Sequence, residues 1–171
     1  MSDETPHSRA VAGTRRRSVA RLAAVQALYQ IDLSGAKPEA VIAEFLKHRL
    51  GREIDGEHYG EADTALFGDI VRGTVEHQAD LDRAISAALT PDWPLDRLET
   101  VLRAILRAGA YELMARGDVP ARVAISEYLD IAHAFFAGKE PGLVNGVLDS
   151  LAHVLRPGDL GDGRRGGPPA Q

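Results

Sequence analysis

One stretch, residues 96–114, constrains the fold more than any other part of the sequence. In DRLETVLRAILRAGAYELM the apolar side chains recur at spacings of three and four residues, which predicts a helix. Those side chains cover most of the circumference of that helix: Leu98, Val101, Leu102, Ile105, Leu106, Ala108, Ala110, Tyr111, Leu113 and Met114. A helix that is apolar on most sides is contacted on several sides, so this one belongs at the centre of a bundle.

The rest of the chain repeats the helical period, and no stretch reads as a strand. Further helices are predicted over residues 15–33, 38–50, 61–77, 80–89, 121–136 and 143–155. Short joints rich in glycine and proline connect most of them, which favours a compact all-α bundle of seven helices. At 171 residues and 44% hydrophobic content, the chain can bury one sizeable core, so a single domain is expected.

The segments outside these helices are polar and lack a period. Residues 1–14 predict a disordered N-terminal arm, and residues 156–171 predict a flexible C-terminal tail. Residues 52–60 are charged and broken by glycine, which predicts a loop. The folded domain is therefore expected to span residues 15–155.

Charge is distributed unevenly along the chain. The formal net charge is −5, yet residues 6–21 carry five arginines and no acidic residue. Arginines at a helix N-terminus oppose the helix dipole, at a cost of roughly a few tenths of a kcal/mol each. An anion outside the chain explains their placement, and a phosphate backbone is the simplest such anion. The alternative is a solvated arm that only aids solubility.

The sequence offers little for catalysis or cofactor binding. It has no cysteine, which excludes disulfides and thiolate chemistry, and it has no glycine-rich phosphate loop, GxSxG turn or HExxH pair. Glu57, His58 and Glu61 are read as surface residues rather than metal ligands. Glu112 and Glu127 lie on two long helices, but nothing in the sequence indicates a substrate cleft between them. We therefore expect no enzyme activity, no metal and no cofactor.

No apolar run approaches the roughly 20 residues of a membrane span. The N-terminus also lacks the apolar core of a signal peptide. These features predict a cytoplasmic protein that does not contact a membrane.

Five strings in the same order and spacing resemble the NusB family of bacterial transcription antitermination factors. They are VQALYQ (25–30), GTVEH (73–77), RAILRAGAYEL (103–113), DVPARVAISEYLDIA (118–132) and VNGVLDSLA (144–152). The resemblance covers about residues 15–155. It implies an all-helical domain of two three-helix groupings that binds the boxA element of nascent ribosomal RNA together with ribosomal protein S10 (NusE), inside the RNA polymerase antitermination complex.

The same resemblance implies site residues. The RNA-binding set lies on the first helix and comprises Arg15, Arg16, Arg17, Arg21, Gln26 and Tyr29. Tyr29 could stack on an unpaired base or bond to a phosphate, or it could be a tyrosine at the edge of the core.

A second set, for the protein partner, comprises Leu102, Arg103, Lys139 and Leu143. The joint before the last helix is often acidic in relatives and ends in an aromatic residue. This chain departs from that pattern, because it has Lys139 and Leu143 there.

Two other functions compete with this interpretation. NusB-like domains also form the N-terminal part of an rRNA cytosine-C5 methyltransferase, although that chemistry uses a cysteine nucleophile that this sequence lacks. The chain could instead be a structural protein that associates with itself, since some relatives form a homodimer that hides the arginine-rich surface.

Overall fold

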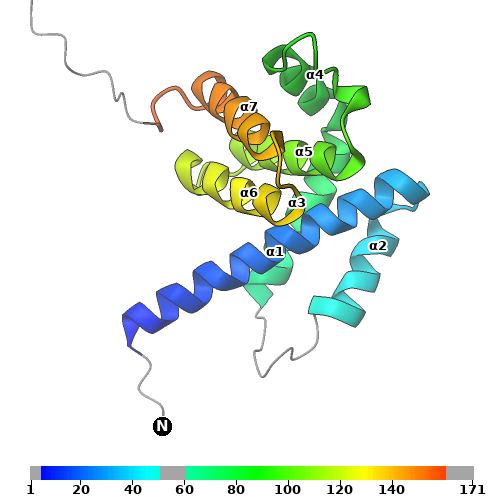
Figure 1. The fold of residues 1–171 in the computed structure, drawn as a ribbon. Helices are drawn as coiled ribbons and strands as arrows, with labels where there is room; N and C mark the ends of the chain where they lie inside the picture. The colour runs from blue at the N-terminus through cyan, green and yellow to red at the C-terminus, as the bar shows by residue number, and fades with distance from the viewer. Residues whose placement is uncertain (1–4, 51–60, 161–171) are drawn as a thin grey trace, which may run out of the picture.

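The computed structural model describes residues 5–50 and 61–160. This part of the chain contains helices and no strand, which confirms the all-α prediction (Figure 1). Its seven α-helices are α1 (Pro6–Ser34), α2 (Pro38–Phe45), α3 (Glu61–Glu76), α4 (Gln78–Ala88), α5 (Thr100–Ala115), α6 (Ala121–Phe135) and α7 (Glu140–Leu155). A π-helical turn, Leu46–Leu50, continues α2, and a 3₁₀ turn, Leu95–Arg97, precedes α5.

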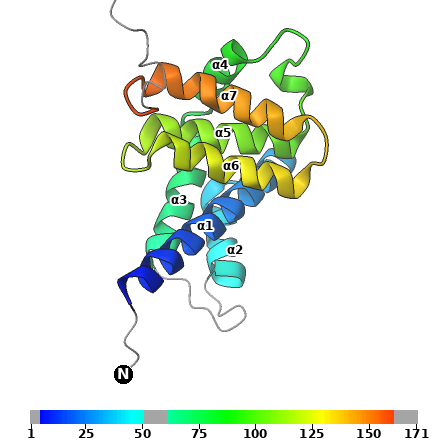
Figure 2. The same ribbon diagram turned by 60° about the vertical axis from the view of Figure 1, so that its left-hand side comes forward.

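The helices form two groups that meet at α5. Helices α1, α2 and α3 pack against one another, and α5, α6 and α7 form a second mutually packed set to which α4 adds. Figure 2 shows α5, α6 and α7 lying side by side across one end of the first group. Because α5 contacts α1, α3, α4, α6 and α7, the prediction that it occupies the centre is confirmed.

The burial of α5 explains its sequence. Most of its residues are buried, and five are 0% exposed: Ile105, Leu106, Ala108, Ala110 and Glu112. The ring of Tyr111 lies so close to the backbone of α3 that a Cβ on Gly73 would overlap it. Gly73 therefore allows α3 and α5 to approach closely, which gives the glycine of the GTVEH string a packing role.

The N-terminal arm differs from its prediction. Helix α1 begins at Pro6 rather than at Arg15, so residues 6–14 are helical and not disordered. Proline suits a first helical turn, where its missing N–H has no partner to lose. The Thr14 hydroxyl also bonds to the Ala10 carbonyl at 3.1 Å, which satisfies this polar side chain within the helix. Residues 1–4 of the predicted arm lie outside the described residues, as does the predicted loop at 52–60.

The first part of the predicted C-terminal tail is docked rather than flexible. The Arg156 guanidinium donates hydrogen bonds to four carbonyl oxygens where α5 ends and the chain turns into α6, those of Glu112, Leu113, Arg116 and Val119. The last carbonyls of a helix have no partner within it, so a buried cation satisfies them well.

Asp159 completes this contact at the start of α6. Its carboxylate accepts the backbone N–H of Ala121 at 2.9 Å, which caps the helix, and it also pairs with Arg156 at 3.1 Å. The backbone bond and the arginine together lower the pKa of Asp159. We call Arg156–Leu160 the C-terminal clip. Residues 161–171 lie outside the described part.

Candidate nucleic-acid interface

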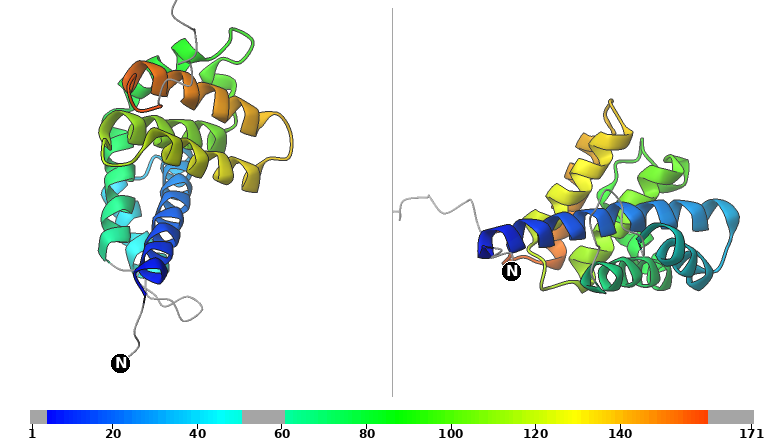
Figure 3. Two further views of the ribbon diagram at one scale, coloured as in Figure 1. Left: turned by 90° about the vertical axis from the view of Figure 1, so that its left-hand side faces the viewer. Right: turned by 90° about the horizontal axis from the view of Figure 1, so that it is seen from below.

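The first half of α1 is a cationic surface without acidic residues. Arg9, Arg15, Arg16 and Arg17 lie on it, and the only acidic residue of the helix is Asp32, near its other end. Arg15 and Arg17 are exposed and Arg16 is half-buried. Consecutive side chains of a helix point about 100° apart, so the three adjacent arginines cover roughly 200° of the helix surface. This part of α1 projects beyond α5, α6 and α7 (Figures 1 and 3).

Gln26 and Tyr29 extend this surface along one face of α1. They follow Arg15 by 11 and 14 residues, which is close to whole helical turns, so the three side chains share a face. Tyr29 is 40% exposed and Gln26 is half-buried. At about 1.5 Å per residue, Tyr29 lies about 21 Å along the helix axis from Arg15, so a ligand that contacts both must be extended. Their role in RNA binding stays a prediction.

Arg21, which the family resemblance includes in the RNA-binding set, does not lie on this outer surface of α1. Its side chain is 2% exposed. Its Nε and Nη2 donate to the two carboxylate oxygens of Glu112 at 2.8 and 3.1 Å, and Glu112 is 0% exposed. The apolar side of α1 therefore includes one arginine, which pairs with a carboxylate in a two-bond fork.

A second carboxylate completes the environment of Arg21. Glu127 of α6 has Oε2 at 3.7 Å from Arg21 Nη1, and its Oε1 accepts a hydrogen bond from Ser18 at 2.9 Å. Burial lowers the pKa of Arg21, but the hydrogen bond and charge of Glu112 raise it more, so the net pKa is raised. Glu112 and Glu127, which the sequence did not assign to a common site, thus hold α1 against α5 and α6.

Tyr128 borders the same buried cluster. It is 0% exposed, and within residues 5–50 and 61–160 its hydroxyl has no hydrogen-bond partner. Burial and the charge of Glu112 raise its pKa well above the ordinary value. Sequence reasoning missed this cluster. The available sign was that Arg21 lies between Ala20 and Ala24 on the apolar side of the first helix.

A groove of about 360 Å³ opens between α1, the connection from α5 to α6, and α6 itself. Its walls combine arginines, acidic groups and apolar side chains: Thr14, Arg17, Arg21, Leu66, Arg116, Asp118, Val119, Pro120, Val123 and Glu127. Arg17 belongs both to the cationic surface and to this groove, so the two features are continuous.

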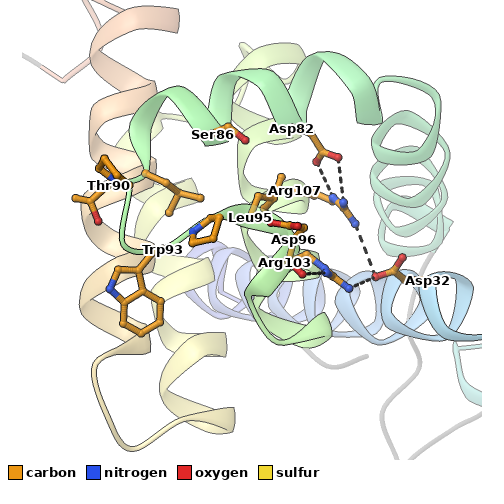
Figure 4. A pocket seen from close by; sticks show the side chains of 12 residues that line it. Asp32, Asp82, Ser86, Thr90, Trp93, Leu95, Asp96, Arg103 and Arg107 are labelled. Atoms are coloured by element: carbon orange, nitrogen blue, oxygen red, sulfur yellow. Dashed lines mark hydrogen bonds and ion pairs between the residues drawn. The ribbon is translucent and has the colours of Figure 1, made fainter.

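A second, larger cleft of about 660 Å³ lies where α1 ends beside α4 and α5 (Figure 4). Arg107 donates to both carboxylate oxygens of Asp82, at 2.7 and 3.0 Å. Arg103 Nη2 donates to Asp32 at 3.1 Å. The exposed Trp93 lies at the other end of the cleft from these ion pairs.

The predicted partner-binding set does not form one exposed surface. Leu102 is 1% exposed and packs in the core, so it cannot contact a partner directly. Leu143 packs partly against the core, and Arg103 is held by Asp32 at the edge of the second cleft. Of the four, only Lys139 is exposed. Leu102 is buried because it lies on the side of α5 that faces the other helices.

No group of three or more histidine, aspartate or glutamate side chains within the described ranges is placed to hold a metal ion. None of the helices described is both long enough and apolar enough to cross a membrane.

Comparison of the sequence with known proteins gives a consistent result. Residues 18–153 match the NusB family. The chain is 55% identical over 146 residues to the transcription antitermination protein NusB of Bradyrhizobium sp. (strain ORS 278), which covers 85% of this chain and 87% of that protein. It is 59% identical over 141 residues to the protein of the same name from Brucella ovis, covering 82% of each.

Solved structures agree with the sequence comparison. The chain is similar to T. maritima NusB, with a TM-score of 0.68 and 30% identity over 80% of this chain and 89% of that one. It is also similar to a chain in a crystal structure of the antitermination factors NusB and NusE in complex with dsRNA, with a TM-score of 0.69 and 28% identity, covering 82% and 98% of the two chains.

Proposed function

The chain belongs to the NusB family, and we propose that it is an RNA-binding antitermination factor that acts with ribosomal protein S10 (NusE) on boxA-type single-stranded RNA of nascent ribosomal RNA transcripts. The observation that carries the proposal is the cationic surface of α1, where Arg15, Arg16 and Arg17 occur with no acidic residue in that half of the helix. A related NusB has been crystallised with NusE and RNA.

The charge distribution sets what this surface can do alone. Arginines bind phosphates without reading sequence, and the chain as a whole carries a net charge of −5. We therefore expect modest binding with limited discrimination among RNAs. A partner that extends the basic surface lets one RNA contact both proteins, so each raises the affinity of the other by the same factor.

The second cleft is our candidate for the S10 contact. Trp93 is 39% exposed there, and an exposed tryptophan beside a polar rim is typical of the energetically important part of a protein interface. Arg103, which the family resemblance assigns to the partner surface, lines the same cleft. We further propose that the protein works in the cytoplasm as a non-catalytic adaptor in the RNA polymerase antitermination complex.

The comparisons favour this function over the two alternatives. The chain covers 87% of the length of an antitermination protein that is 55% identical to it, which supports a factor rather than one module of a methyltransferase. Self-association through the arginine surface would compete with RNA binding. Light scattering with and without RNA tests it, because a competing homodimer would dissociate when RNA is added.

The direct test is replacement of Arg15, Arg16 and Arg17 by alanine. If each contacts one phosphate, the slope of log K against log salt falls by about 2 in magnitude, since each contact to single-stranded nucleic acid contributes roughly 0.7. Fluorescence anisotropy with a boxA-type RNA at several salt concentrations measures the slope.

A matched control removes the same charge elsewhere. Lys37, Arg83 and Arg97 are exposed cations away from this half of α1, and their joint replacement by alanine should leave the slope close to that of the wild-type chain. Equal slopes for both triple variants would mean that only net charge matters and that α1 is not the RNA surface.

The partner proposal needs its own titration. With S10 present, boxA-type RNA should bind about 5- to 150-fold more tightly, the usual range of coupling between two sites, and a scrambled RNA should gain less. Trp93→Ala should reduce this gain without changing RNA binding by the chain alone. Equal tightening of both RNAs by S10 would contradict the adaptor function.

A further inference from the structure

The groove of about 360 Å³ beside the cationic surface is distinct from the outer face of α1 that we propose to contact phosphates. Its lining includes the exposed Arg17 and two much less exposed groups, Arg21 and Glu127. Arg21 is 2% exposed and Glu127 is 16% exposed. The groove therefore combines a surface rim with an interior polar floor, which is the usual construction of a ligand site.

The floor presents a donor and an acceptor side by side. Arg21 uses Nε and Nη2 to bind Glu112, whereas Nη1 makes no hydrogen bond within the described part of the chain. Nη1 lies 3.7 Å from Glu127 Oε2, which is too far for a direct hydrogen bond. Both groups thus retain hydrogen-bonding capacity at a site that is largely shielded from water.

A phosphate does not match this floor. Its oxygens only accept hydrogen bonds and would face the negative charge of Glu127. The edge of an unpaired base, in contrast, carries donors and acceptors next to each other. The side walls are apolar, with Leu66, Val119 and Val123 among them, which suits a planar ring better than a charged group.

Arg17 lies both in the groove and on the cationic surface of α1. No ion pair holds its guanidinium within residues 5–50 and 61–160, so the planar group can stack on a base at the rim. Arg16 and Arg15 precede it on the outer surface. A single strand can therefore place its phosphates on the outer arginines and turn one base inward.

We propose that the groove between α1 and α6 receives one unstacked base of the bound RNA, with Arg21 Nη1 and Glu127 contacting its edge, Arg17 stacking on its face and Val123 forming a wall. The proposal rests on the proposed function, since it requires that α1 binds RNA. It adds a site that reads a base to a surface that otherwise contacts only the backbone.

The test measures a series of abasic RNAs against the wild-type chain and against a variant whose groove is filled by a larger side chain. Each base of a boxA-type RNA is removed in turn to leave an abasic nucleotide, and the affinity for the wild-type chain is measured by anisotropy. One position should lose about tenfold, a typical loss for a base stacked on a protein. In Val123→Trp, which fills the groove, the intact RNA should bind about tenfold more weakly and that position should lose less than twofold.

Two further variants control for folding and chemistry. Val123 is 44% exposed and Val154 is 77% exposed, so tryptophan at either site should leave the core undisturbed. Val154→Trp on α7 lies outside the groove and should keep the wild-type abasic profile. Glu127→Gln keeps the shape of the floor, and it should change which bases are tolerated at the sensitive position while leaving the salt slope unchanged.

The outcomes separate the two proposals. An abasic profile that is the same in wild type, Val123→Trp and Glu127→Gln, with the arginine-dependent salt slope intact, overturns the base site alone. A wild-type chain that does not bind the RNA, or binds it without that slope, overturns the proposed function and the base site together.

Discussion

Arg17 and Arg21 lie one turn apart on the same helix, yet they have opposite environments. Arg17 is exposed on a part of α1 that projects from the molecule, whereas Arg21 is 2% exposed and forms a two-bond ion pair with Glu112. The difference arises because Arg21 lies where α5 and α6 pack against α1 and supply Glu112 and Glu127, whereas Arg17 lies nearer the projecting end of the helix. An arginine-rich sequence therefore contains both exposed and structural cations, and the position of the neighbouring helices separates them.

The largest expected effect comes from removing the buried member of this pair. Arg21→Met leaves the Glu112 carboxylate buried without a partner, so the free energy of unfolding should fall by about 3–5 kcal/mol. Urea denaturation followed by circular dichroism measures it. The double variant Arg21→Met, Glu112→Leu should regain most of the loss, since it removes the unpaired charge. A loss below about 1 kcal/mol in the single variant would show that Arg21 is not structural.

The second effect concerns Arg156, which bonds mainly to neutral carbonyl groups and also pairs with the more exposed carboxylate of Asp159. Its side chain is 10% exposed and satisfies carbonyl oxygens at the end of α5. Arg156→Ala should lower the free energy of unfolding by about 2–3 kcal/mol, in line with hydrogen bonds from a charged donor. Arg156→Lys should recover only part of it, because a lysine cannot reach several acceptors in one plane. Full recovery of stability by Arg156→Lys would show that the positive charge at this position, and not the planar shape of the guanidinium, provides the stabilisation.

A third effect extends the comparison to a tyrosine. Burial, together with the hydrogen bond to Asp69 at 2.8 Å, raises the pKa of Tyr111 from 10.0 to about 12. The unfolded chain then ionises first, so the stabilisation is complete below pH 10 and is lost as the pH rises through 12. Relative to Tyr111→Phe, the wild-type chain should lose about 2 kcal/mol of stability between pH 9 and 11.5. A constant difference across that range would contradict the raised pKa.

The smallest effect is expected for the exposed arginines. Replacing Arg17 by methionine should change the free energy of unfolding by less than about 0.5 kcal/mol, because an exposed residue in a projecting part of a helix contributes little packing. The same urea denaturation used for Arg21→Met measures it. A loss comparable to that of Arg21→Met would remove the distinction between the two arginines.

Much of the fold follows from the helical periodicity of the sequence. The predictions that differ from the structure share one physical cause, which is contact between residues far apart in the sequence. The apolar residues of α5 predicted its central position because a helix that is apolar on most sides must be covered. The burial of Arg21 was not predicted, because its charge is visible in the sequence whereas its buried partner Glu112 lies 91 residues away. The burial of Leu102 was missed for a related reason. The family resemblance places this position on a partner surface, but it does not show whether this chain exposes the side chain.

The predictions for the two chain ends differ from the structure because the composition of a segment says nothing about what packs against it. Residues 6–14 lack an apolar face but contain nothing that prevents continuation of a helix, and α1 extends through them. Arg156 and Asp159 read as tail residues, but α5 and α6 leave backbone groups at their ends that these side chains satisfy. The groove beside Arg17 was also invisible, because α1, α3, α6 and the connection before α6 all contribute to it.

The 91-residue separation between Arg21 and Glu112 also has a consequence for how the protein is made. A ribosome adds about 5–20 residues per second, so Arg21 leaves it about 5 to 18 seconds before its counter-ion has been synthesised. During that interval Arg21 has no buried carboxylate partner, because α5 and α6 supply both Glu112 and Glu127. The packing of α1 against α5 and α6 is therefore completed late in translation, after the second half of the chain has been made.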